Sequence, residues 1–235
     1  MAASLVLLPG LLCDRAVWHS QIDALGPAFV ADHGSLDSLA AMAAHTLATA
    51  PAGPLAVAGH SMGGRVAFEM LRQAPDRIER LALLDTSYHP LADGAAGETE
   101  TKGRLALLAI ARRNGMRAMA RDWALGMVHP SRHDGPVFEA VLDMFERHTP
   151  DIFAAQINAL LNRPDCSELL STIRCPTLLL CGREDAWSPP SRHEHMQRAI
   201  PGSRLVVVEQ CGHMSTMEQP EAVSQALADW LGRGS

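Results

Sequence analysis

Short apolar runs alternate with longer helical patterns through most of this 235-residue chain. The sequence shows six such runs, at residues 5–8, 28–32, 55–58, 80–84, 177–181 and 205–208. They are apolar at successive positions, which is typical of strands that helices cover on both faces. The helical patterns between and after them occupy residues 36–49, 62–73, 192–199 and 221–231. This alternation predicts an α/β fold with a mainly parallel sheet of about six strands.

One long segment interrupts the alternation. Residues 88–171 contain no strand-like run, and the periodicity of residues 104–125 and 137–161 is helical. We therefore expect residues 1–87 and 172–235 to form one core, with residues 88–171 inserted into it as a helical cap. The length of the chain fits a single large domain of this kind.

Composition and charge exclude several other classes of protein. Hydrophobic residues make up 47% and charged residues 20% of the chain, which is close to the average of globular proteins. The formal net charge of −6 argues against nucleic acid as the main partner. No run approaches the roughly 18 apolar residues that a membrane span needs, and the N-terminus lacks the basic region of a secretory signal. We expect a cytoplasmic protein that binds neither nucleic acid nor a membrane.

The segment 55–65, Leu-Ala-Val-Ala-Gly-His-Ser-Met-Gly-Gly-Arg, combines a predicted strand, a sharp turn and the start of a helix. The turn has the pattern G-x-S-x-G around Ser61. Such a turn needs small residues at Gly59 and Gly63, because larger side chains would collide with the neighbouring strand or helix. The start of a helix also stabilises negative charge. The segment therefore predicts that Ser61 is an exposed nucleophile.

A serine hydroxyl becomes a good nucleophile when a base accepts its proton and a carboxylate orients that base. Asp185 and His213 each follow a predicted strand downstream of Ser61. Because the carboxyl ends of parallel strands meet at one edge of a sheet, these three side chains can converge. Asp85 also follows a predicted strand and is the alternative acid.

Four segments carry a resemblance to the α/β-hydrolase superfamily. They are Leu-Pro-Gly-Leu at residues 8–11, Gly-His-Ser-Met-Gly-Gly at 59–64, Gly-Arg-Glu-Asp at 182–185 and Gly-His-Met at 212–214. The superfamily's order of nucleophile, acid and histidine is met, whereas its usual His-Gly pair after the first strand reads Pro9-Gly10 here. The resemblance implies an α/β-hydrolase fold and an oxyanion hole made of the Leu11 and Met62 N–H groups. Within the superfamily the chain is similar to carboxylesterases of the pimeloyl carrier-protein methyl ester esterase type.

These observations together predict a serine hydrolase that cleaves small to medium carboxylic esters or thioesters through an acyl-enzyme intermediate. Two alternatives stay open. One is a lyase of the menaquinone-pathway type, whose turn resembles this one and in which Arg65 would bind a substrate carboxylate. The other is a hydrolase-like receptor that binds its ligand without turnover. We expect no cofactor and no metal, because His193 and His195 alternate along a helix and are better explained as surface residues.

Three further residues are expected to contact the substrate, namely Leu12, Arg65 and Trp187. A basic stretch in the expected cap is also notable, because it contains no acidic residue. Its members are Lys102, Arg104, Arg112, Arg113, Arg117 and Arg121. One interpretation is a solvated helix face. The other is a surface that binds the anionic groups of an acyl carrier protein or of coenzyme A, because arginine binds such groups bidentately.

Overall fold

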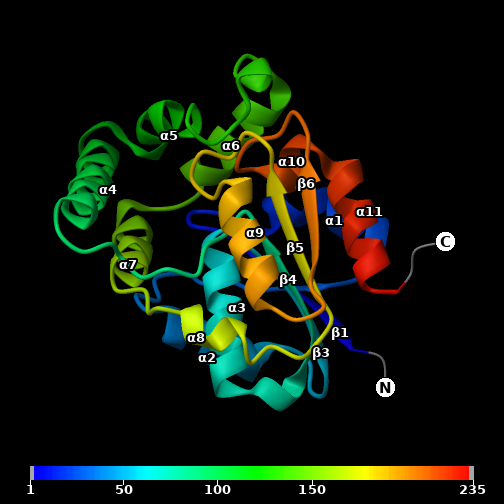
Figure 1. Cartoon of the computed structure of the whole chain (residues 1–235). Coiled ribbons are helices and arrows are strands. Elements are labelled where there is room, and N and C mark those ends of the chain that lie inside the picture. Colours follow the sequence, from blue (N-terminus) through cyan, green and yellow to red (C-terminus); the bar gives the residue numbers. More distant parts are fainter. Residues whose placement is uncertain (1–2, 233–235) are drawn as a thin grey trace.

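A computed structural model describes residues 3–232, and within them the predicted parallel sheet of six strands is confirmed (Figure 1). Its strands are β1 (Ser4–Leu8), β2 (Phe29–Val30), β3 (Leu55–His60), β4 (Ile78–Leu84), β5 (Thr177–Gly182) and β6 (Arg204–Val208). Their spatial order is β2-β1-β3-β4-β5-β6, and all neighbours are parallel. Every residue of β3 and β5 is buried. This burial on both faces explains the continuous apolar runs of the sequence.

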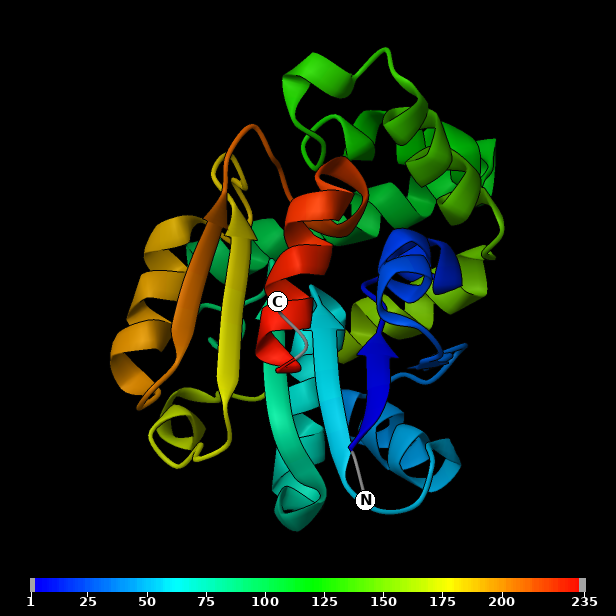
Figure 2. The ribbon, with the colours of Figure 1, turned by 90° about the vertical axis from the view of Figure 1, so that its right-hand side faces the viewer.

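Helices cover both faces of the sheet, as expected (Figures 1 and 2). One face carries α2 (Leu39–Thr49), α3 (Met62–Gln73) and α9 (Pro190–Ala199), and the other carries α1 (His19–Leu25) and α11 (Pro220–Trp230), with α10 (Ser215–Glu218) just before it. The helix α2 begins three residues later than predicted, because the Ser38 hydroxyl accepts the Ala41 N–H at 3.2 Å and caps it. Within residues 3–232, no helix is both long enough and apolar enough to cross a bilayer.

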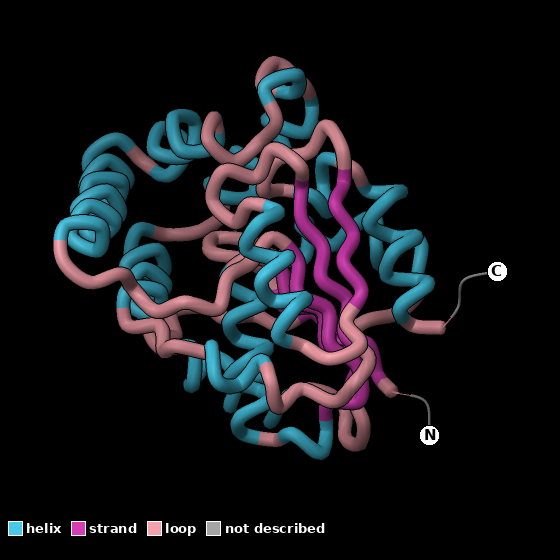
Figure 3. The backbone as a smooth tube through the Cα atoms, in the orientation of Figure 1, coloured by secondary structure: helices cyan, strands magenta, loops and turns pink. Residues whose placement is uncertain are grey.

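The segment between β4 and β5 consists of helices and loops throughout the described structure (Figures 1 and 3). Its helices are α4 (Ala95–Asn114), α5 (Met116–Ala124), α6 (Pro136–Glu146), α7 (Pro150–Leu161) and α8 (Ser167–Leu170). The predicted pattern over residues 104–125 is divided at Gly115, whose φ of 89° ends α4. The pattern over residues 137–161 is divided where Thr149 caps α7. The boundaries of a separate cap stay a prediction.

The basic stretch of α4 and α5 is largely neutralised by acidic side chains. Arg117 forms ion pairs with Glu139, Asp143 and Glu146 of α6, and Arg121 pairs with Glu139. These acids lie on another helix, so the sequence window alone does not include them. For this part of the stretch the structure favours a paired helix face over an open cationic surface.

Candidate active site

Ser61 occupies a strained turn between β3 and α3. Its φ of 54° and ψ of −115° lie outside the regions that serine usually adopts, at a cost on the order of 1–3 kcal/mol. A Cβ at Gly59 would overlap the Gly63 carbonyl, and a Cβ at Gly63 would overlap the Leu8 carbonyl. The Ser61 N–H donates to the Leu84 carbonyl at 2.9 Å, which ties the turn to β4. The predicted need for small residues on both sides of the serine is thus confirmed.

The structure brings together the three side chains predicted from the strand ends. His213 Nδ1 lies 2.8 Å from Asp185 Oδ2, and His213 Nε2 lies 2.9 Å from Ser61 Oγ. The other carboxylate oxygen, Asp185 Oδ1, accepts the Trp187 and Ser188 N–H groups at 2.9 Å each. The backbone therefore orients Asp185, and Asp185 orients the imidazole.

The charges within this group act on each other. Burial by itself would raise the pKa of Asp185, but the charge and hydrogen bond of His213 hold it below its ordinary value. Burial would lower the pKa of His213, but the Asp185 carboxylate outweighs this and raises it. An ionised Asp185 requires a proton on His213 Nδ1, which leaves Nε2 free to accept the Ser61 hydroxyl.

Asp85, the alternative acid, is fully buried in a different position. Its Oδ1 accepts a backbone N–H from β5 at 3.1 Å, and its Oδ2 accepts the Ser215 hydroxyl. His60 Nε2 is 3.6 Å from the same Oδ2. Burial and the neighbouring charge of Asp185 raise the pKa of Asp85 well above its ordinary value. In the described chain, Asp185 and not Asp85 makes the hydrogen bond to His213.

Two backbone N–H groups beside Ser61 have no hydrogen-bond acceptor within residues 3–232. One belongs to Leu11, which lines a cavity together with Ser61. The other belongs to Met62, the first residue of α3, whose N–H has no intrahelical acceptor. Unpaired donors next to a nucleophile can stabilise a developing oxyanion.

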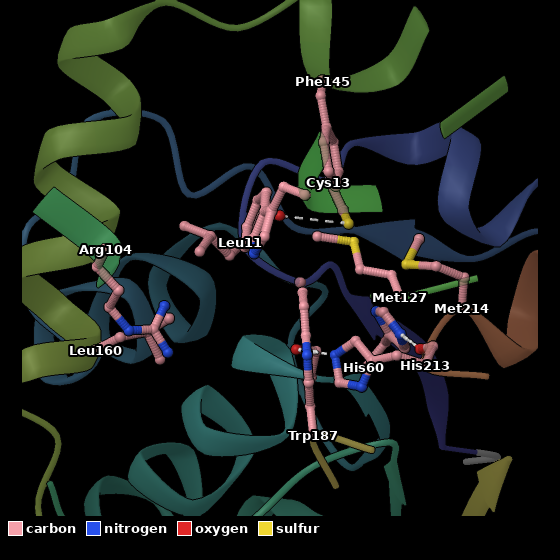
Figure 4. A pocket seen from close by; sticks show the side chains of 13 residues that line it. Leu11, Cys13, His60, Arg104, Met127, Phe145, Leu160, Trp187, His213 and Met214 are labelled. Atoms are coloured by element: carbon pink, nitrogen blue, oxygen red, sulfur yellow. Dashed lines mark hydrogen bonds between the residues drawn. The ribbon is translucent and has the colours of Figure 1, made fainter. Parts of the chain in front are cut away.

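Two cavities of about 460 Å³ and about 60 Å³ meet at Ser61 and His213. They share an aromatic wall in which Trp123 stacks on Trp187 with ring centroids 5.6 Å apart, and Trp187 lies 5.0 Å from the His213 ring. The smaller cavity is otherwise mainly apolar (Figure 4). Its apolar residues include Leu11, Cys13, Met127, Phe145 and Met214. Ser61 therefore lies between a small apolar cavity and a larger cavity.

Arginine side chains line the larger cavity. Arg104 and Arg163 both bind the carboxylate of Glu100. Arg65 is 9% exposed and donates from Nη1 to the His89 carbonyl at 2.9 Å, but it has no carboxylate partner in the described chain. Burial and the charge of Arg163 lower the pKa of Arg65 to about 9, so it remains mainly cationic at neutral pH. The cavity therefore presents a buried cation that forms no ion pair with a carboxylate among residues 3–232.

The remaining predicted positions have different outcomes. Trp187 lines both cavities, whereas Leu12 is fully buried in the hydrophobic core and lines neither. The surface position expected for His193 is wrong, because α9 packs this residue against the sheet and its Nε2 lies 3.4 Å from the Thr86 N–H. Residues 3–232 contain no group of three or more His, Cys, Asp or Glu side chains that could hold a metal ion. Trp123 also lines both cavities, although it is not adjacent in the sequence to any of the predicted catalytic residues.

A family comparison agrees with this geometry. The model of the Alpha/beta hydrolase family matches residues 5–226. The chain belongs to this family. The predicted superfamily and fold are thereby confirmed, and the expectation of a carboxylic ester hydrolase is confirmed at the level of the family.

Individual proteins are similar to this chain over most of its length. The pimeloyl-[acyl-carrier protein] methyl ester esterase of Neisseria meningitidis serogroup B is 29% identical over 195 residues, which cover 83% of this chain and 75% of that protein. The enzyme of the same name from Nitrosomonas europaea is 28% identical, covering 92% and 91%. The solved structure of a thermophilic esterase from Thermogutta terrifontis, with malate bound, is 31% identical with a TM-score of 0.86 and covers 99% of this chain and 90% of its own.

Proposed function

We propose that this chain is a serine hydrolase that cleaves small to medium carboxylic esters or thioesters through an acyl-enzyme intermediate. The observation that carries the proposal is the hydrogen-bonded series Ser61, His213 and Asp185 at the junction of two cavities. Ser61 Oγ attacks the carbonyl carbon while His213 Nε2 accepts its proton, and the N–H groups of Leu11 and Met62 bind the oxyanion. His213 returns the proton to the leaving group. Water then releases the acyl group by the same steps.

The charge of the larger cavity supports a substrate with a negative group. A buried guanidinium such as Arg65 gains most from an ionised partner, which a carboxylate or a phosphate supplies. We infer that the small cavity takes a short alcohol and that the large one takes an acyl part ending in such a group. The esterases of Neisseria and Nitrosomonas are named for an ester carried on acyl carrier protein, and the Thermogutta esterase holds malate, a dicarboxylate. These relatives support an anionic ester, either free or linked to acyl carrier protein or coenzyme A.

The proposal is tested with a panel of methyl monoesters of dicarboxylic acids, acyl-coenzyme A thioesters and neutral p-nitrophenyl esters. We expect Arg65→Met to raise KM for the anionic members by about 10- to 100-fold, since a hydrogen bond to a charged group is worth about 1.5–3 kcal/mol. KM for p-nitrophenyl butyrate should stay within about twofold. Arg183→Met is a matched control, because Arg183 pairs with Glu209 at the surface and lines neither cavity. An equal effect of Arg65→Met on charged and neutral esters would contradict the anionic substrate.

The same panel, together with a fluorophosphonate label, distinguishes the hydrolase from the lyase and from the receptor. A lyase that uses Arg65 for a substrate carboxylate would leave all esters intact, while a fluorophosphonate would still label Ser61. A receptor without turnover would bind the anionic compounds with neither hydrolysis nor labelling. Hydrolysis of any ester together with labelling of Ser61 supports the hydrolase.

The pH dependence of kcat/KM should report the ionisation of His213. Only the neutral imidazole accepts the Ser61 proton, so activity is present above the pKa of His213 and is lost as pH falls through it. Because Asp185 raises this pKa, the acid limb should have its midpoint above the ordinary 6.5. His60 does not interfere, since burial lowers its pKa to about 4. A profile for p-nitrophenyl butyrate with its midpoint clearly below that ordinary value would contradict the arrangement.

A further inference from the structure

A buried glutamine of α7 contacts the loop that follows β1. Gln156 is 2% exposed, its Oε1 accepts the Leu12 N–H at 2.9 Å, and its Nε2 donates to the Gly34 carbonyl at 3.0 Å. The orientation of the amide is determined, because the Leu12 N–H needs an acceptor and the Gly34 carbonyl needs a donor. Gln156 therefore bridges two loops that lie 144 and 122 residues away in the chain.

The Leu12 N–H belongs to a tight turn. The Cys13 N–H donates to the Gly10 carbonyl at 3.1 Å, which places Leu11 and Leu12 at the centre of the turn. Leu12 has a φ of 56°, whereas Leu11 does not have a positive φ. This combination corresponds to a type II turn, whose third position favours glycine. In a type I turn, which suits leucine better, the peptide between Leu11 and Leu12 is rotated by more than a right angle, so its N–H would turn away from Gln156.

This turn lies directly against the nucleophile. A Cβ on Gly10 would come within 3.2 Å of the Ser61 Cβ, so the loop has almost no free space there. The next residue, Leu11, carries an unpaired N–H and lines the small cavity beside Ser61 (Figure 4). The Leu11 N–H belongs to the peptide before the one that Gln156 binds, so its position depends on where Gln156 holds the turn as a whole. We propose that Gln156 is a positioning residue that holds this turn in place against Ser61, so that the Leu11 N–H reaches the oxyanion, a role that rests on the proposed function.

The test compares Gln156→Met, which removes both hydrogen bonds at similar length, with Gln156→Glu, which keeps an oxygen acceptor for the Leu12 N–H. We expect Gln156→Met to lower kcat for p-nitrophenyl butyrate by about 10- to 100-fold with KM within about twofold, since complete loss of one oxyanion donor costs about 10²–10³-fold. Gln156→Glu should recover at least about half of this loss on a logarithmic scale. Asn158→Ala is the matched control, because Asn158 on the same helix binds the Asp37 carbonyl and does not contact the turn.

A second measurement does not need activity. Hydrogen exchange of the Leu12 amide, followed by NMR, should become at least about tenfold faster in Gln156→Met, while amides of the sheet keep their protection. If kcat and Leu12 exchange both match the unsubstituted chain, or if Gln156→Glu loses as much kcat as Gln156→Met, the positioning role is wrong. If the unsubstituted chain hydrolyses no ester, the proposed function fails, and the role of Gln156 is then judged from Leu12 exchange alone. A loss of sheet protection in both variants would show a merely structural role and would likewise overturn it.

Discussion

Ser61→Ala is expected to lower kcat for p-nitrophenyl butyrate by about 10⁵- to 10⁶-fold, the size of effect seen when the nucleophile of a serine hydrolase is removed. The reason is that no other hydroxyl makes a hydrogen bond to His213 in the described chain. KM is not informative here, so binding of a non-hydrolysable substrate analogue is measured by calorimetry. It should change by less than about threefold, because alanine removes only one small polar atom from the cavity wall.

A fluorophosphonate provides the control for this prediction. The reagent should form one covalent adduct on the unsubstituted chain, located at Ser61 by peptide mass spectrometry, and none on Ser61→Ala. Thr216→Val is a matched control, since this buried hydroxyl lies in α10 and lines neither cavity at Ser61. Hydrolysis by Ser61→Ala within about tenfold of the unsubstituted rate would exclude the acyl-enzyme at this residue.

Features that depend on local sequence were predictable. Strands buried on both faces appear as unbroken apolar runs, and the turn around Ser61 is specified by Gly59 and Gly63, whose missing side chains leave room for the neighbouring backbone. The predicted proximity of the strand ends follows from the parallel order of the sheet. These features need only the spacing of residue types along the chain.

Features that depend on how distant segments pack were not predictable. The sequence favoured Asp185 and kept Asp85 as the alternative acid, because both follow a strand; the choice depends on which carboxylate lies against the distant His213, and this is Asp185. Leu12 was expected at the substrate, but its positive φ places the side chain in the core and its N–H against Gln156. The contact between Leu12 and Gln156 leaves no periodic pattern in the sequence, since it joins a loop to a distant helix.

The second large effect is expected for Asp185→Asn, which should lower kcat far more than the same substitution at Asp85. In Asp185→Asn, the side-chain oxygen can still accept the Trp187 and Ser188 N–H groups, so the amide NH₂ faces His213 Nδ1. The imidazole must then accept at Nδ1 and carry its proton on Nε2, where it cannot accept from Ser61. We expect kcat to fall by about 10⁴-fold, as when the triad aspartate of a serine protease is replaced by asparagine.

Asp85→Asn should lower kcat by less than about tenfold, because burial and the charge of Asp185 already disfavour ionisation of Asp85 by raising its pKa, and asparagine has nearly the same shape. Both variants are compared by kcat for p-nitrophenyl butyrate and by thermal unfolding, which checks that each remains folded. The midpoint of the acid limb of the pH profile is an independent measurement. In Asp185→Asn this midpoint should fall, because the carboxylate that raises the pKa of His213 is gone. In Asp85→Asn most of the raised pKa of His213 should remain. If Asp85→Asn proves as damaging as Asp185→Asn while both remain folded, the imidazole depends on both carboxyl groups, and the assignment of Asp185 as the orienting acid is wrong.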